Sequence, residues 1–268
     1  MPILNYIVED ITMYLPIFRG RMFELLALEF LIRNDLLGDK IIPIIEPVKI
    51  TTTLRRVIES FIEKRHEIGL VCNPTVGELV HESSQIISTI TEINGFQEYL
   101  IPVLHMNEDC DTTYQQLSDY YSKEALIASC SQIENISRCL SFVQDECLRY
   151  ILVGESREFT RQIPSNLGGK VLCADRFSKR QRNVDYIEDE DEFFSSDHIY
   201  FREDGFKGIS DYSIIGDEFI DGGFAPKAVA IHIIYQDNQQ VFRIHHFVSD
   251  SNDDTSNPAG KFGEALLK

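Results

Sequence analysis

The segment Lys40-Ile-Ile-Pro-Ile-Ile-Glu46 is an apolar run that ends in a carboxylate, and similar runs follow it along the chain. The later runs span residues 68–73, 99–105, 125–130, 148–155 and 170–175. The ends of successive runs lie roughly 20 to 32 residues apart, the length of a strand, a loop and a crossover helix. Because each run is nearly continuous in apolar residues, it predicts a strand buried on both faces, as in a parallel sheet.

Helical patterns separate these predicted strands. In segment 53–63 the apolar residues stand at 54, 57, 58, 61 and 62, which is the spacing of one helix face. Segment 135–144 shows a similar pattern. Ahead of the first run, residues 21–33 predict a further helix, with Gly38 where a helix stop is expected.

Beyond Asp175 the rhythm is less regular. Residues 207–212 and 228–235 predict two more strands, and 241–248 would form a hairpin with the latter. Six regular and two irregular units favour a single (β/α)8 barrel over residues 13–268, preceded by an extension at 1–12. An open doubly wound sheet is the alternative, although no GxGxxG follows any strand. In the barrel, residues 259–268 would form a last helix that is short or cut off.

The composition limits the classes of function. The 268 residues include 43 Asp and Glu against 25 Lys and Arg, a formal net charge of −18. Such a chain is not expected to offer a broad nucleic-acid surface or to bind an anionic membrane. No apolar run is long enough to span a bilayer, and the N-terminus lacks a basic signal region. The six cysteines form no CxxC pair and predict reduced core thiols in a cytoplasmic protein.

In a (β/α)8 barrel the functional side chains gather at the C-terminal ends of the strands. The six clear runs end in Glu46, Asn73, His105, Cys130, Glu155 and Asp175, while Asp211 and His232 lie in or near the two later strands. From these we predict a catalytic set of Glu46, His105, Glu155, Asp175, Asp211 and His232. The alternative interpretation is that strands often end in a polar residue simply because a loop begins there.

Each predicted residue has a chemical role. Glu46 or Asp175 would be the base, since burial separates the pKa values of paired carboxylates. His105 or His232 would be the acid or a metal ligand, which leaves a divalent ion open as a cofactor. Ligand binding is assigned to Arg19, Asn73, Arg176 and Tyr212, with either arginine orienting an anion. No GxSxG, Walker A or HExxH motif is present, as expected for sites assembled across units.

Several segments resemble the phage-type beta-protein family. They are Pro16-Ile-Phe-Arg-Gly-Arg-Met-Phe-Glu-Leu-Leu-Ala-Leu28, Ile42-Pro-Ile-Ile-Glu-Pro-Val-Lys49, Asn73-Pro74, Gly208-Ile-Ser-Asp-Tyr212 and His246-Phe-Val-Ser-Asp-Ser-Asn-Asp-Asp254. The likeness runs from about Met13 to the C-terminus. It implies a bacterial cytoplasmic protein that acts with a neighbouring gene product in antiviral defence. The family carries no agreed chemistry, so the candidate residues rest on the pattern of this sequence alone.

Two hypotheses about function follow. In the first, the barrel hydrolyses or binds a phosphate-containing or nucleotide-like ligand as a component of a defence system. In the second, it is a non-catalytic sensor or scaffold whose acidic surface docks a basic partner enzyme. The oligomeric state stays open in both.

Overall fold

The computed structural model describes residues 13–143, 147–213, 216–220, 222 and 225–268. Within them, eight strands form one parallel sheet in chain order: β1 (Ile17–Phe18), β2 (Ile44–Ile45), β3 (Ile68–Val71), β4 (Leu100–His105), β5 (Ile127–Cys130), β6 (Leu148–Val153), β7 (Gly168–Cys173) and β9 (Gly208–Ser210). Parallel bridges from Tyr14 to Ile209 and from Ile17 to Tyr212 join the first strand to the last. The sheet therefore closes on itself, and the predicted (β/α)8 barrel is confirmed.

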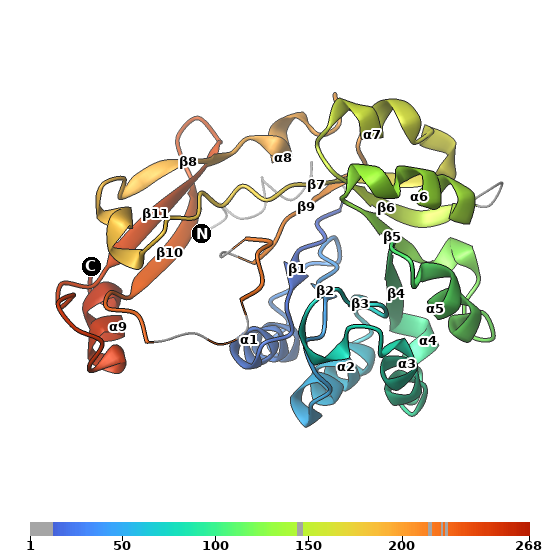
Figure 1. Ribbon diagram of the computed structural model, residues 1–268, viewed down its shortest axis with the longest axis horizontal. Coiled ribbons are helices and arrows are strands. Elements are labelled where there is room, and N and C mark those ends of the chain that lie inside the picture. The colour runs from blue at the N-terminus through green and yellow to red at the C-terminus, as the bar shows by residue number, and fades with distance from the viewer. Residues whose placement is uncertain (1–12, 144–146, 214–215, 221, 223–224) are drawn as a thin grey trace. The chain divides into compact units, whose positions relative to one another are not determined.

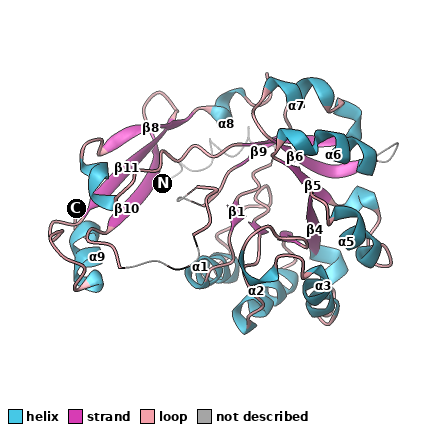
Figure 2. Cartoon of the chain, in the orientation of Figure 1, coloured by secondary structure: helices cyan, strands magenta, loops and turns pink. Residues whose placement is uncertain are grey.

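Helices alternate with these strands and lie on their outer side (Figures 1 and 2). They are α1 (Met22–Arg33), α2 (Thr52–Glu63), α3 (Ser83–Thr91), α4 (Phe96–Tyr99), α5 (Cys110–Leu117), α6 (Ile136–Val143) and α7 (Arg157–Gln162), with 3-10 turns at Gly77–Leu79, Lys123–Ala125, Ile133–Asn135 and Ser165–Leu167. Local sequence explains where they start. The Thr51 hydroxyl accepts from Leu54 N at 3.0 Å at the start of α2, and Glu24 accepts from Arg21 N at 3.0 Å at the start of α1.

Two apolar layers hold the barrel together, and alternation along each strand decides which layer a residue joins. Ile44 packs inside the ring, whereas its neighbour Ile45 packs toward the helices. The interior cluster includes Leu15, Ile17, Ile42, Ile44, Val71, Ile101, Val103, Ile127, Leu152, Val171 and Cys173. The same alternation continues past the end of each strand. The residue two positions after the last interior residue therefore faces the mouth of the barrel, at the C-terminal ends of the strands.

The strand count differs from the sequence prediction at both ends of the barrel. The first strand is β1, which precedes α1, so the run at 40–46 supplies the second strand. The prediction that 228–235 completes the barrel was wrong, because β9 completes it instead.

The described chain divides into two compact units rather than the single domain expected over 13–268. Unit 1 is the barrel, up to Ala174 and again from Phe201 to Ser213, and unit 2 consists of 175–200 and 214–268. Unit 2 has an antiparallel sheet in the order β10 (Ala230–Gln236), β11 (Phe242–Val248), β8 (Asp191–Ser195). Its helical elements are a 3-10 helix at Asn183–Ile187, α8 (Asp197–Tyr200) and α9 (Pro258–Leu266).

Two further sequence predictions fall on unit 2 or beyond it. The hairpin of 228–235 with 241–248 is confirmed as β10 and β11. The C-terminal helix α9 packs on these two strands, so its assignment as a barrel helix was wrong. The proposed extension at 1–12 lies outside the described residues.

All six cysteines are reduced thiols. Five of them are buried, as predicted, and Cys147 is exposed. In the described part of the chain, no helix combines the length and the apolar character needed to cross a bilayer.

Candidate active site at the barrel mouth

Polar side chains replace the apolar ones at the C-terminal end of the barrel interior. Arg19 follows β1, Glu46 follows β2, Asn73 follows β3, and His105 is the last residue of β4. Each stands two residues beyond an interior position such as Ile17, Ile44, Val71 or Val103. The next strand, β5, contributes Ser129 in the same way, two residues beyond Ile127. These side chains form what we call the mouth cluster.

Glu46 is the centre of the mouth cluster and is only 1% exposed. Its Oε1 accepts from Thr75 N at 2.8 Å and from the Thr75 hydroxyl at 3.1 Å, and lies 3.2 Å from His105 Nε2. Its Oε2 forms an ion pair with the Arg19 guanidinium. Burial alone would raise the pKa of this carboxyl. The hydrogen bond and charge of His105, the charge of Arg19 and the Thr75 amide outweigh burial and lower the pKa to about 2.

His105 lies between an acid and an alcohol. Its side chain is 17% exposed. Nε2 faces Glu46, and Nδ1 lies 3.1 Å from the Ser129 hydroxyl. Because an ionised carboxylate can only accept, Nε2 carries a proton. In the neutral imidazole Nδ1 is then an acceptor, and Ser129 donates to it.

Asn73 fixes the backbone at the end of β4. Its Oδ1 accepts from His105 N at 2.9 Å, while Nδ2 donates to His105 O at 2.8 Å and to Asn107 Oδ1 at 2.8 Å. These bonds tie β3 to the strand that carries His105. These contacts give Asn73 a positioning role, and its predicted role in ligand binding stays a prediction.

Arg19 is held from two directions. Besides its ion pair with Glu46, its guanidinium carbon lies 5.0 Å from the centre of the Tyr212 ring, a cation–π distance. Tyr212 follows β9, so this contact joins the first and last strands at the mouth. Arg19 and Tyr212, which stand at opposite ends of the barrel sequence and were both predicted to bind ligand, are therefore in contact.

The loop after β3 brings Thr75 to Glu46. Glu78 N donates to Val48 O at 2.8 Å, which holds this loop against the one after β2. Gly77 has a φ of +80°, and a Cβ there would lie 2.5 Å from Val48 O. Only glycine permits this close approach without strain.

Asp211 was predicted as catalytic, but its neighbours Ser210 and Tyr212 hold the interior positions. Its Oδ1 accepts from the Tyr14 hydroxyl at 2.7 Å. Burial, followed by the charge of Asp211 and this hydrogen bond, raises the pKa of Tyr14, so the phenol remains a donor. Asp211 thus strengthens the joint between β1 and β9. Glu155, also predicted, lies exposed in the turn after β6.

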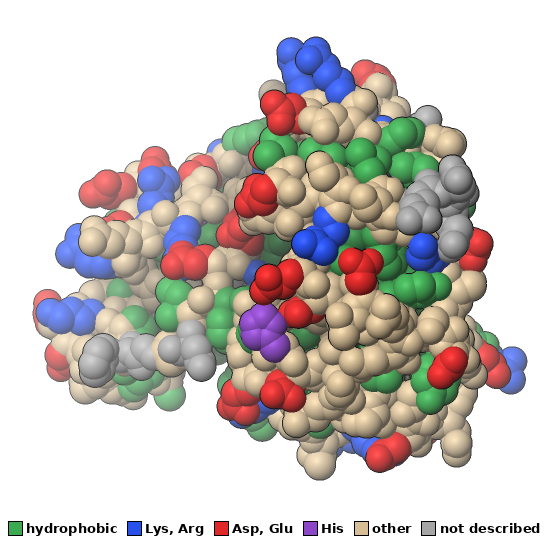
Figure 3. Space-filling model, turned by 45° about the vertical axis from the view of Figure 1, so that its right-hand side comes forward, with side chains coloured by type: hydrophobic (Ala, Val, Ile, Leu, Met, Phe, Trp, Pro, Cys, Tyr) green, Lys and Arg blue, Asp and Glu red, His purple; other side chains and the backbone are tan. Residues whose placement is uncertain are grey.

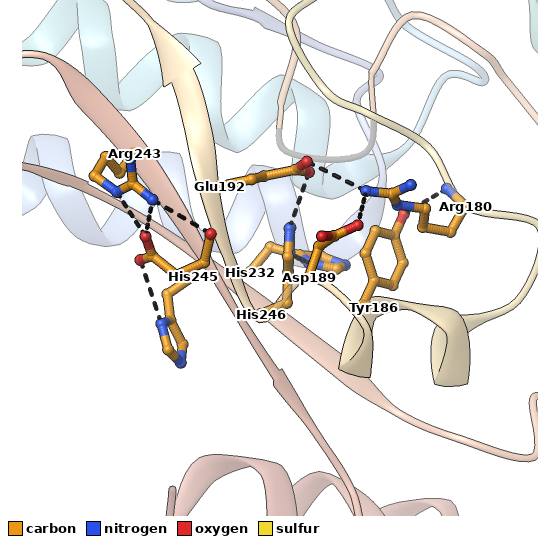
Figure 4. A network of polar contacts seen from close by, with 9 residues as sticks. Arg180, Tyr186, Asp189, Glu192, His232, Arg243, His245 and His246 are labelled. Atoms are coloured by element: carbon orange, nitrogen blue, oxygen red, sulfur yellow. Dashed lines mark hydrogen bonds and ion pairs between the residues drawn. The ribbon is translucent and has the colours of Figure 1, made fainter.

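Three other predicted residues belong to unit 2, and their described contacts lie within it. The Asp175 carboxylate accepts from Phe177 N at 3.0 Å and Asp217 N at 2.9 Å, and Arg176 forms a two-pronged pair with Asp197. His232 lies in the sheet, its Nδ1 2.6 Å from that of His246 (Figure 4). The assignment of His232 to a barrel strand was wrong. A shared site of these residues with the mouth cluster stays a prediction.

The histidine pair of unit 2 forms its own network. His246 Nε2 lies 3.2 Å from Glu192 Oε1, and Glu192 in turn pairs with Arg180 at 3.2 Å (Figure 4). The rings of Phe177 and Tyr186 pack against His232. Burial and then the charge of His246 lower the pKa of His232 to about 4.

Ser129 and Thr75 were missed by the sequence analysis, which took Cys130 as the end of its strand. Cys130 packs in the outer layer, and Ser129 faces the interior. The period of two along the strand, counted from Ile127, is the signal that could have found Ser129.

A comparison of the chain with protein-family models and with curated proteins found no match. The resemblance to the phage-type beta-protein family therefore stays a prediction. No group of three or more His, Cys, Asp and Glu side chains in the described ranges is arranged to hold a metal ion.

Proposed function

We propose that the barrel mouth binds and hydrolyses a phosphate-containing or nucleotide-like ligand, with His105 as the group that moves protons. The observation that carries this proposal is the buried, ionised Glu46, which contacts an arginine and a histidine at once. One carboxylate thereby fixes an anion-binding group and a proton-transfer group at the end of the barrel where such sites occur.

The proposed chemistry assigns a separate task to each residue. Arg19 supplies positive charge for the oxygens of a phosphate group. His105 accepts a proton as the attacking oxygen bonds to phosphorus, and Glu46 stabilises the resulting imidazolium. With a pKa of about 2, Glu46 is too weak a base for this step itself. We therefore assign the base role to His105 and a positioning role to Glu46.

We infer a component of a bacterial antiviral defence system acting with a partner protein. Its support is the resemblance of the segments around Arg19, Glu46, Asn73, Tyr212 and His246 to the beta-protein family.

A second candidate is the non-catalytic sensor or scaffold that docks a basic partner. The net charge of −18 favours it. On the face shown in Figure 3, acidic side chains are interspersed with basic ones. Partner binding that weakens strongly with added salt is expected for such a surface.

The test pairs binding with turnover. Nucleotides, cyclic nucleotides and inorganic phosphate are titrated calorimetrically into the purified chain, and hydrolysis is followed by chromatography. Arg19→Met is expected to weaken binding about 10-fold or more, since it removes charge-assisted hydrogen bonds. His105→Gln is expected to lower turnover about 100-fold or more with little change in binding.

Arg157→Met is the matched control, because Arg157 is exposed at the start of α7. Equal losses in Arg157→Met and Arg19→Met would contradict the proposal, as would a folded chain that binds none of these compounds. Binding without turnover, insensitive to His105→Gln, would favour the sensor.

A further inference from the structure

We propose that Ser129 is a nucleophile that His105 activates and that attacks the phosphorus atom of the ligand. The choice of a phosphorus substrate rests on the proposed function. The activation of Ser129 rests on the geometry of unit 1 alone.

Three residues from three strands form a chain of hydrogen bonds. Glu46 Oε1 lies 3.2 Å from His105 Nε2, and His105 Nδ1 lies 3.1 Å from Ser129 Oγ. An alcohol beside a base that an acid orients is the arrangement that activates serine nucleophiles on unrelated folds. In the usual serine–histidine–aspartate arrangement, Nδ1 faces the acid and Nε2 faces the serine. Here Nε2 faces the acid and Nδ1 faces the serine, and the proton path is otherwise the same.

The direction of the hydrogen bonds follows from the charges. Glu46 is ionised and paired with Arg19, so it accepts from Nε2–H. When the ring is neutral, Nδ1 has a lone pair aimed at Ser129. The hydroxyl proton of Ser129 consequently points at a base, and this makes Ser129 Oγ more nucleophilic.

Another buried serine at the same end of the barrel shows the contrast. Ser210 on β9 is 3% exposed, and its hydroxyl donates at 2.6 Å to the backbone oxygen of Leu15. A carbonyl oxygen does not take up the proton, so Ser210 is structural. Ser129, 6% exposed, has an imidazole in that place.

The proposed step is balanced as follows. The Ser129 Oγ–P bond forms while the bond from phosphorus to the leaving oxygen breaks. The hydroxyl proton passes to His105 Nδ1 and then to the leaving oxygen. Water next attacks the phosphoseryl phosphorus, gives its proton to His105, and the departing Ser129 oxygen takes that proton back.

A fluorophosphonate probe tests the nucleophile without knowledge of the natural ligand. Attack would form a Ser129–O–P bond, expel fluoride and leave a stable adduct, which intact-mass and peptide mass spectrometry detect. We expect one adduct on Ser129 in the whole chain. Ser129→Ala should abolish it, and His105→Gln should slow it about 100-fold or more.

The pH profile separates an activating base from a structural histidine. A pH-dependent step in the labelling rate of the parent should be missing from His105→Gln if His105 is the activating base. Ser131→Ala, which alters an exposed serine just after β5, should label like the parent.

Circular dichroism confirms that each variant is folded. Labelling elsewhere, labelling that survives Ser129→Ala, or no labelling of the folded parent would overturn the proposal. Labelled Ser129 in a chain that hydrolyses no phosphate compound would instead refute the proposed function and keep the nucleophile. Phosphate turnover that survives Ser129→Ala would keep the function and refute the nucleophile.

Discussion

The barrel mouth and the sheet of unit 2 each contain a histidine beside a glutamate, in different surroundings. In each, a histidine Nε2 lies 3.2 Å from a glutamate oxygen: His105 with Glu46, and His246 with Glu192. The second ring nitrogen makes the difference. It faces the hydroxyl of Ser129 in the mouth and another imidazole, His232, in unit 2.

The comparison shows that the partner on the far side of the ring sets the chemistry. A hydroxyl can give up its proton and attack, as we propose for Ser129. A second imidazole can only share a proton. Burial, and then the charge of His246, also disfavour the charged form of His232.

The largest expected effect comes from the glutamates. Glu46→Gln should lower the free energy of unfolding by about 3–5 kcal/mol, because the buried Arg19 loses its counter-charge. Glu192→Gln should cost only about 1 kcal/mol, since Glu192 is 22% exposed and water screens its contacts. Urea unfolding followed by circular dichroism measures both.

Glu63→Gln, at the exposed end of α2, should change the free energy by less than about 0.5 kcal/mol. If the Glu46 and Glu192 variants were equally stable, burial would not distinguish the two sites.

Acid should separate the two regions by the order in which they loosen. His232 has a pKa of about 4 when folded against an ordinary 6.5, so the stability it contributes is complete above pH 6.5 and is lost as the pH falls toward 4. Glu46 has a pKa of about 2 against 4.5, so its contribution is complete above pH 4.5 and is lost as the pH falls toward 2. Unit 2 should therefore weaken first.

Hydrogen exchange, corrected for intrinsic rates, checks this order. Amides of β10 and β11 should lose protection between about pH 6.5 and 4, ahead of those of β2 to β4. His232→Gln should remove the early step. Simultaneous loss in both units only below pH 4.5 would count against the role assigned to His232.

The smallest effect is expected at the joint between the first and last strands. Tyr212→Leu should destabilise the barrel by about 0.5–1 kcal/mol through loss of the cation–π contact with Arg19. Tyr212→Phe keeps an aromatic face and should lose less. A shift in melting temperature that is the same for both variants would show that the ring face contributes little.

The barrel was predictable because its strands β2 to β7 are apolar on both faces and evenly spaced. β1 was not, since Ile17–Phe18 is too short to show a period and stands directly before a strong helix. β10 was wrongly assigned to the barrel because a strand of any sheet has the same local sequence pattern. Only its tertiary pairing shows that it belongs beside β11. Sequence spacing carries no information about such pairing.

The mouth cluster was predictable in part for a related reason. Glu46, Asn73 and His105 end strands at interior positions, so the rule that favours strand ends found them. Cys130 and Asp211 also end or follow strands, but each is one residue out of phase with the interior. Arg19 and Tyr212 were chosen for their chemistry, and only ring closure brings them within reach of each other.

The route of the chain through the two units has a consequence for synthesis and for dissection. Residues 175–200 leave the barrel before β9 has been made, and they carry β8 of the other sheet. A nascent chain that ends at Ala174 lacks β9, the strand that closes the barrel. One that ends at Ser213 has a closed barrel, but its β8 lacks the β10–β11 hairpin with which it forms a sheet. No single cut yields two complete pieces. The protein is therefore a poor candidate for expression as separate halves, and unit 2 should fold only after its hairpin has been made, later than the barrel.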